Sequence, residues 1–185
     1  MDNILPYNNI YPKLDEDVFI APGAWVIGDV VIGRKSSVWF NTVVRGDEHY
    51  IRIGSETNVQ DHAMLHGTPM EFPLEIGNRV TIGHGAIVHG CIVEDECMIG
   101  MGAIVMDGVK IGRGSLIAAG SLVPQGLVVP AGSLVMGTPA KVIRTLDEAA
   151  QKRMLRSVTN YLQLISTYRA ASPLDDAKQV KGFLG

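Results

Sequence analysis

The side chains with the clearest capacity for chemistry in this sequence are three histidines, His66, His84 and His89. Neutral imidazole is a common ligand of zinc and other divalent metals. His84 and His89 lie five residues apart in the stretch IGHGAIVH. That interval exceeds one helical turn and places the two side chains on opposite faces of a strand, so a single element does not bring them to one ion. The elements that position the histidines therefore have to be identified first.

A six-residue repeat of aliphatic side chains runs through most of the chain. Every sixth residue from Val93 to Val135 is aliphatic. Earlier series with the same six-residue interval begin at Ile20, Ile53 and Ile76, each offset from the next. The position four residues after each aliphatic is usually small or β-branched. A period of six fits neither an amphipathic helix nor an alternating strand. It is typical of a hexapeptide β-solenoid, in which each hexapeptide is one short strand plus a bend and three of them make a triangular coil.

The repeat predicts an all-β solenoid of about six coils over residues 10–143, in a chain that forms a single domain. After Gly137 the pattern changes. Thr145 with Glu148 three residues later predicts a capping-box start, and an apolar stripe at helical spacing follows, so we expect one amphipathic α-helix over residues 145–171 that Pro173 closes. We expect the polar tail, residues 172–185, to be loosely held.

Two breaks in the repeat fall near the histidines. The step from Val44 to Ile53 is three residues too long and the step from Leu65 to Ile76 is five too long, and insertions of this kind predict surface loops. Numbering the strands through these breaks places His66 and His89 directly after inward aliphatic residues, on one face and one coil apart. Adjacent β layers are about 4.8 Å apart. Two nitrogens on one tetrahedral zinc are roughly 3.3 Å apart, so stacked histidines need only lean together.

His84 falls on a neighbouring face and does not easily reach the same ion within one chain. If three identical prisms pack around a threefold axis, His84 of one subunit can complete the site that His66 and His89 form on its neighbour. The spacing therefore predicts a metal site divided between two subunits of a homotrimer.

Composition and charge exclude several other classes of function. The formal net charge is -3 and no lysine or arginine cluster stands out, so we expect no nucleic-acid partner. The first ten residues lack the features of a signal peptide, and no apolar run approaches a membrane span, so we expect no membrane partner and a cytoplasmic location. The two cysteines, Cys91 and Cys97, are expected to be reduced, half-buried small hydrophobes.

Four stretches of the chain carry a resemblance to a known family. They are VVRGDEHYIRIGSETNVQDHAMLHG, VTIGHGAIVHGCIV, IGMGAIVMDGVKIG and GTPAKVIR, and over residues 10–170 the chain resembles the gamma-class carbonic anhydrase and carbonic-anhydrase-like hexapeptide family. The resemblance implies a left-handed parallel β-helix in a homotrimer, with zinc, or alternatively iron or cobalt, held between subunits. By position, His66, His84 and His89 would be its ligands. A metal-bound hydroxide would then reversibly hydrate carbon dioxide to bicarbonate.

Further site residues follow from the same resemblance. Gln60 matches a glutamine that bonds the metal-bound solvent, and Asn58 matches a neighbouring polar position. Arg45 and Asp47 match the family RxD, Asp61 matches its acidic partner, and Glu48 matches an acidic residue near the site. We expect Arg45 to pair with Asp61 across the subunit interface. An assembly salt bridge without a catalytic role is the alternative for these residues. Tyr161 resembles an aromatic residue near the metal, with a core position on the apolar stripe as its alternative.

One departure from the family bears on activity. The acidic loop that carries a proton-shuttling glutamate in one branch of the family is short here, so turnover is expected to be low unless Glu71, Glu75, His49 or His62 transfers the proton. Two other functions remain open. Many hexapeptide trimers are acyl-coenzyme A-dependent acyltransferases with a single histidine base, and a non-catalytic metal-stabilised scaffold is also consistent with the ligand set. Three histidines in ligand register favour a metal site over a transferase.

Overall fold

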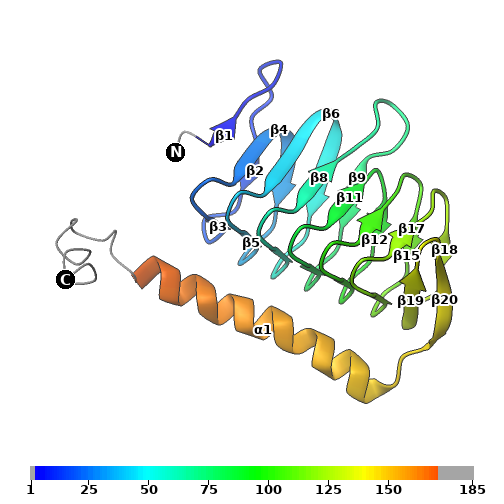
Figure 1. The fold of residues 1–185 in the computed structure, drawn as a ribbon. Helices are drawn as coiled ribbons and strands as arrows, with labels where there is room; N and C mark the ends of the chain where they lie inside the picture. The colour runs from blue at the N-terminus through cyan, green and yellow to red at the C-terminus, as the bar shows by residue number, and fades with distance from the viewer. Residues whose placement is uncertain (1–2, 171–185) are drawn as a thin grey trace, which may run out of the picture.

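Residues 3–170 are described by a computed structural model, in which the chain forms a parallel β-solenoid of about seven turns followed by one helix (Figure 1). Each turn runs along three faces, and the solenoid strands of successive turns pair in parallel. The predicted solenoid is confirmed. It has one more turn than expected because two N-terminal strands precede Ile20 and pair with the solenoid.

The three faces are named here by their strands. Face one consists of β1 (Ile4–Leu5), β8 (Met64–His66), β11 (Ile87–His89), β14 (Ile104–Val105) and β17 (Leu122–Val123). Face two consists of β2 (Lys13–Leu14), β9 (Leu74–Ile76), β12 (Ile92–Val93), β15 (Lys110–Ile111) and β18 (Val128–Val129). Face three consists of β3 (Phe19–Ile20), β5 (Ser37–Val38), β7 (Asn58–Val59), β10 (Thr81–Ile82), β13 (Met98–Ile99), β16 (Leu116–Ile117) and β19 (Ser133–Gly137). Two longer strands, β4 (Trp25–Ile32) and β6 (Val43–Ile53), run from face one to face two.

The interior of the solenoid is a stack of the repeated aliphatic residues. The eight aliphatic residues from Val93 to Val135 are each at most 2% exposed, and those of the earlier series are buried apart from Ile20, which is partly exposed. The small residues four positions later also point inward, where Ser115 and Thr42 bond to backbone carbonyls of the next turn. Removing these aliphatic side chains from water is the main force that holds the turns in register.

The first of the two insertions is a strand and not the loop that we expected. Residues 43–53 continue as β6 around the corner between faces one and two, side by side with β4. The two strands approach closely at Gly28 and Gly46, where a Cβ on Gly28 would lie 2.5 Å from the Gly46 carbonyl oxygen. β6 pairs with β4 up to Gly46 and again from Ile51, and residues 47–50 bulge between these two paired stretches, opposite Asp29.

The second insertion does form a loop, over residues 67–73, at the same corner. Thr68 and Phe72 bridge its two ends through backbone hydrogen bonds. The Phe72 side chain lies against Gly90 and Gly108 of the next two turns, where added Cβ atoms would be 2.7 Å and 3.1 Å from it. Glycines at these corners therefore make room for the loop's anchor.

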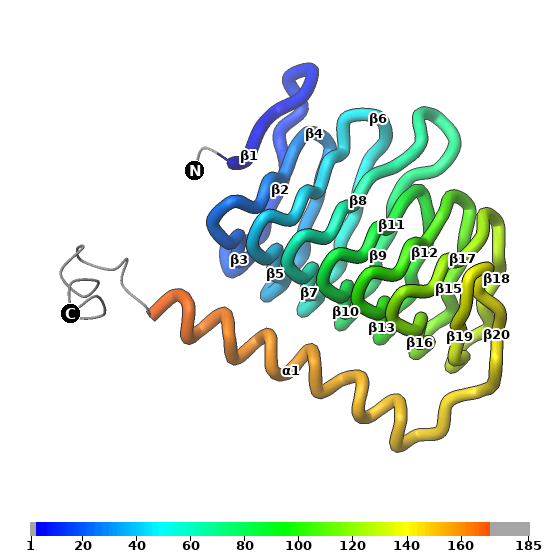
Figure 2. The backbone as a smooth tube through the Cα atoms, in the orientation of Figure 1, coloured from blue at the N-terminus to red at the C-terminus, as the bar shows by residue number. Residues whose placement is uncertain are grey.

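Helix α1 (Glu148–Ala170) runs along the outside of the solenoid, back from its C-terminal turns toward its N-terminal turns (Figures 1 and 2). The hairpin of β19 with the antiparallel β20 (Ala140–Thr145) leads into it. Ala150 and Met154 pack with Leu134 and Leu146 against Met98 and Leu116 on face three. Near the other end, the rings of Tyr161 and Tyr168 contact Trp39 edge-on. No helix among residues 3–170 is long and apolar enough to cross a membrane.

The predicted start of the helix was wrong by a few residues. Thr145 is the last residue of β20 and pairs with Ser133, so it cannot cap the helix. The cap is Asp147, whose Oδ1 accepts a 2.7 Å hydrogen bond from the Ala150 backbone N–H. Pro173 and the predicted tail lie outside the described residues.

Candidate metal centre

His66 and His89 lie opposite each other in adjacent strands of face one. β8 and β11 pair with His66 directly across from His89, and His66 Nδ1 is 3.0 Å from His89 Nε2. The register follows from the inward aliphatic residues, because Leu65 and Val88 are paired in the same two strands. The hexapeptide core therefore fixes the spacing of the two imidazoles.

A carboxylate holds the far nitrogen of each ring. Asp107 Oδ1 lies 2.6 Å from His89 Nδ1, and Asp47 Oδ1 lies 3.0 Å from His66 Nε2. An ionised carboxylate can only accept hydrogen bonds, so both of these ring nitrogens carry protons. Burial raises the pKa of Asp47, but hydrogen bonds from Arg45 and His66 outweigh burial and leave that pKa below its ordinary value. Asp47 is therefore an acceptor at neutral pH.

These tautomers leave a lone pair on each of the two facing nitrogens. Two lone pairs 3.0 Å apart repel each other unless a cation lies between them, either a proton or a metal ion. Nitrogens that share a tetrahedral zinc are roughly 3.3 Å apart. Carboxylates that orient metal-bound imidazoles in this way are a regular feature of metal sites. The residues present therefore fit a metal ion.

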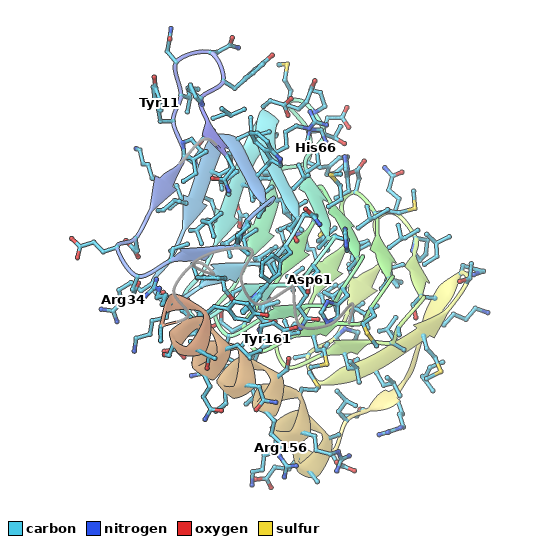
Figure 3. All side chains as sticks on the ribbon, turned by 60° about the vertical axis from the view of Figure 1, so that its left-hand side comes forward. Tyr11, Arg34, Asp61, His66, Arg156 and Tyr161 are labelled. Atoms are coloured by element: carbon cyan, nitrogen blue, oxygen red, sulfur yellow. The ribbon has the colours of Figure 1, made fainter. Side chains whose placement is uncertain are left out.

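His84 lies on the next corner and contacts neither of the other two histidines. It follows β10 on face three, and its side chain is 47% exposed. Asp61 Oδ2 lies 2.8 Å from its Nδ1, and Tyr161 of helix α1 places its hydroxyl 3.4 Å from its Nε2. Figure 3 shows Asp61 and Tyr161 close together and His66 well separated from them. In residues 3–170 of one chain, no three His, Cys, Asp or Glu side chains are arranged to hold a metal ion.

The other predicted site residues fall into two groups. Gln60 lies under His84: its Oε1 accepts from the His84 backbone N–H at 3.2 Å, and its Nε2 donates to Asn58 Oδ1 at 3.1 Å. Arg45 forms an ion pair with Asp47 of its own chain, and Asp61 is taken by His84, so the expected pairing of Arg45 with Asp61 is absent within the chain and stays a prediction for an assembly. Glu48 is exposed beside Asp47.

The remaining histidines are separate from this group. His49 contacts the ring of Tyr50, and His62 is exposed at the corner next to Asp61. Of the acids considered for proton transfer, Glu75 accepts a 2.8 Å hydrogen bond from the Tyr50 hydroxyl, whereas Glu71 is exposed. Burial raises the pKa of Tyr161 to about 12, so its hydroxyl stays protonated and can donate to His84.

Two features of the site were not predicted from the sequence. One is Asp107, which lies one turn beyond His89. The other is a row of outward-facing apolar residues on face one, beside the histidines, which we call the apolar ladder. Its members pair from turn to turn, and they are Trp25, Val43, Met64, Ile87, Ile104 and Leu122. Four of the six are between 37% and 40% exposed. Counting one residue back from each inward aliphatic of face one would have found this ladder.

Comparison with known proteins identifies the family. Residues 90–125 match the family "Bacterial transferase hexapeptide (six repeats)", and residues 73–106 match "Hexapeptide repeat of succinyl-transferase". A protein of Methanocaldococcus jannaschii named "Probable carbonic anhydrase" is 49% identical over 154 residues, which cover 83% of this chain and 96% of that protein. "Gamma carbonic anhydrase 1, mitochondrial" of Arabidopsis thaliana is 43% identical over 171 residues, 89% of this chain.

The chain spans only 62% of the length of that plant relative and 57% of a second one, "Gamma carbonic anhydrase 2, mitochondrial". Among solved structures, a hexapeptide transferase family protein from Anaplasma phagocytophilum is 40% identical, with a TM-score of 0.87 over 91% of this chain and 99% of that one. The repeat, the fold and the high identity over nearly whole relatives agree. The chain belongs to the gamma carbonic anhydrase family of hexapeptide-repeat proteins.

Proposed function

We propose that this protein is a metal-dependent, gamma-type carbonic anhydrase that reversibly hydrates carbon dioxide to bicarbonate, at a site shared between subunits of a homotrimer. The observation that carries the proposal is the 3.0 Å separation of His66 Nδ1 and His89 Nε2, with a carboxylate at the other nitrogen of each ring. Relatives named carbonic anhydrase, similar over most of this chain, support the reaction. Zinc is the proposed metal, with iron or cobalt as alternatives, since imidazole suits all three.

A neighbouring subunit would supply His84 as the third ligand. Asp61 binds its Nδ1, so Nε2 is the nitrogen left to face an ion, once Tyr161 gives up its 3.4 Å contact. The apolar ladder of face one supports the assembly, because a continuous stripe of exposed apolar side chains is a common mark of a protein interface. His84 follows a strand of face three, whereas His66 and His89 end strands of face one, so packing of three prisms around an axis can bring the two sets together.

The metal ion, when bound, would act as a Lewis acid that lowers the pKa of water to near neutrality. The chain's own residues hold the geometry around it. Gln60 is 6% exposed, and its amide is held by Asn58 and by the His84 backbone N–H, so it positions the turn after β10 that carries His84. Arg45 and Asp47 orient His66 from the other side. Glu48 is exposed beside them, where it can exchange protons with solvent.

Proton transfer is expected to be the slow step, because few acidic side chains near the site are placed to accept the proton. The loop over residues 67–73 carries a single acid, Glu71, and the Glu75 carboxylate is engaged by Tyr50. General acid or base catalysis typically contributes about 100- to 10,000-fold to a rate, so a weak shuttle lowers turnover without abolishing the site. Added imidazole buffer should therefore raise the hydration rate.

Metal content and carbon dioxide hydration test the proposal together. We expect about one ion per chain in protein loaded with zinc or with iron under anaerobic conditions, and hydration of carbon dioxide that a chelator abolishes. His84→Ala should lose most of the metal, whereas His62→Ala, an exposed histidine on the same corner, should keep it. Absence of metal from the loaded wild-type protein would rule the proposal out.

The acyltransferase alternative has support from the fold. A hexapeptide-repeat acetyltransferase from Vibrio cholerae is 27% identical, with a TM-score of 0.52 over 63% of this chain. A transferase needs one histidine base and a groove for the acyl carrier, and it needs neither the facing lone pairs nor their two carboxylates. Acetyl transfer from acetyl-coenzyme A that survives chelation and His84→Ala would favour it. Metal without hydration would instead favour a metal-stabilised scaffold.

A further inference from the structure

Asp107 connects one of the paired histidines to the loop over residues 67–73. It follows β14 at the corner between faces one and two, one turn beyond His89. One carboxylate oxygen, Oδ1, accepts from His89 Nδ1 at 2.6 Å, and the other, Oδ2, accepts from the Thr68 hydroxyl at 2.9 Å. The side chain is only 26% exposed, so both bonds are partly shielded from water. Shielding makes hydrogen bonds to a charged group stronger and more directional.

The position of the His89 proton decides which nitrogen faces His66. A neutral imidazole carries its single proton on either nitrogen, and the group at the other end selects which one. With Asp107 accepting at Nδ1, the lone pair lies on Nε2, 3.0 Å from His66 Nδ1. Without that carboxylate, the ring is free to place a proton on Nε2. A proton there would occupy the space in which the two lone pairs converge.

We propose that Asp107 is a positioning residue for His89 and that Thr68 holds Asp107 in place. The inference rests on the proposed function for its purpose, a metal site, but its geometry stands without it. Asp47 and Asp61 play matching parts at His66 and His84, yet neither is tied to a loop. The second insertion thus helps to orient His89. Phe72 anchors the loop against Gly90 and Gly108, and the anchored Thr68 holds the Asp107 carboxylate through its hydrogen bond.

The tautomer of His89 is the first test, and it needs no metal. Two-bond nitrogen–proton correlations of the metal-free trimer with 15N-labelled histidine, at about pH 8.5 where free imidazole is neutral, report which nitrogen is protonated. We expect Nδ1–H at His89 in the wild-type protein and in Thr68→Ser. We expect a shift toward Nε2–H in Asp107→Ala. An Nε2–H ring in the wild-type protein, or no change in Asp107→Ala, would overturn the inference.

Zinc affinity, measured by competition with a chromophoric chelator, is the second test. Loss of an orienting carboxylate typically weakens metal binding about 10- to 100-fold, which we expect for Asp107→Ala. Thr68→Val, which removes only the hydroxyl from a partly exposed loop position, should weaken it less, and Thr68→Ser should restore it. Glu71→Gln is the matched control, because it removes a charge from the same loop without touching a histidine, and its affinity should equal that of the wild-type protein.

The two tests separate the two ideas. If the wild-type protein binds no zinc, the proposed function fails, while the tautomer measurement still decides the role of Asp107. If the wild-type protein binds zinc and Asp107→Ala and Thr68→Val bind it equally well, the positioning role fails and the proposed function stands. Thermal unfolding and the mass of the assembly confirm that each variant is folded before either measurement.

Discussion

Cys91 and Cys97 illustrate how strongly the solenoid controls single residues. Both are buried in the core, and burial raises the pKa of Cys97 to about 11 and that of Cys91 still further. Because the thiolate is the reactive form, a thiol-specific reagent at about pH 8 should label neither cysteine in the native protein and both in denaturant. An exposed cysteine introduced by Thr159→Cys serves as the reactive control. Rapid native labelling of either natural cysteine would contradict the burial.

The raised pKa of Cys97 also predicts that alkaline pH lowers the free energy of unfolding. A thiol whose folded pKa lies above its unfolded value contributes stability that is complete below the unfolded pKa, about 8.5, and that falls as pH rises toward the folded value. We therefore expect the free energy of unfolding to decline between about pH 8.5 and the Cys97 value of about 11, and Cys97→Ser or Cys97→Ala to reduce that decline. Chemical denaturation at several pH values measures it.

Among the site residues, the sequence predicted those positions that follow directly from the six-residue repeat. The placement of His66 opposite His89 follows from counting in sixes, because the buried aliphatic before each histidine sets its register. Asp107 was not predictable in that way, since it follows the inward Val105 by two residues whereas His89 follows Val88 by one, so the contact joins different register positions of adjacent turns. Within one chain Arg45 pairs with Asp47, two residues away in the same strand, and its pairing with Asp61 of another subunit stays a prediction.

At the scale of elements, the N-terminal cap of helix α1 differs from the one that the sequence pattern predicts. Thr145 and Glu148 have capping-box spacing, but β20 claims Thr145 for its pairing with β19, and Asp147 becomes the cap. Replacing a capping aspartate with alanine typically costs about 1 kcal/mol. Asp147→Ala should therefore lower the free energy of unfolding by about that amount, and Thr145→Ala should change it much less. Equal losses in urea denaturation would contradict this assignment of the cap.

Gly100 and Gly102 lie in one turn but are required for different reasons: Gly100 for close stacking between turns and Gly102 for its positive φ. Gly102 has φ +64 and open space where an added methyl group would lie, whereas a Cβ on Gly100 would lie 2.4 Å from the Ala119 backbone nitrogen. Gly102→Ala meets only the left-handed penalty, about 1 to 2 kcal/mol. Gly100→Ala must push neighbouring turns apart, so we expect a loss above about 3 kcal/mol. Denaturant unfolding of the two variants compares them, and similar losses would contradict the tight stacking at Gly100.

The inserted segment in β6 shows why the repeat alone did not give this element. A period of six predicts a bend after each inward aliphatic, so the extra residues after Val44 suggest a loop. The chain instead stays extended as β6 and pairs with β4 on both sides of the insertion, while residues 47–50 bulge out opposite Asp29. Recognising it requires knowing that both strands stay extended round the same corner, which the hexapeptide period does not reveal because it depends on pairing between turns.

For the whole molecule, the outward positions of faces one and two differ in character. On face two charged and apolar residues are mixed, because Lys13, Arg52, Glu75 and Lys110 share the outward positions with Val31, Ile92 and Val128. On face one the outward positions form the apolar ladder described above, so burying face one against another subunit would remove that apolar surface from water. The sequence predicted trimer assembly from the separation of His84 from His66 and His89. The ladder supports the same assembly through a feature that has no ligand role.

One pair of substitutions tests which face is buried in the assembly. Ile87→Asp and Val128→Asp change residues just before an inward valine, on faces one and two, at 40% and 65% exposure. If face one lines the threefold axis, Ile87→Asp brings three carboxylates together and buries them, and such unpaired buried charge is strongly unfavourable. We expect Ile87→Asp to sediment as a single chain and Val128→Asp to keep the mass of three. Because the proposed site takes ligands from two chains, only Ile87→Asp should also lose its metal. A trimeric Ile87→Asp protein that retains metal would place the shared surface elsewhere and would remove the physical reason for dividing the three histidines between chains.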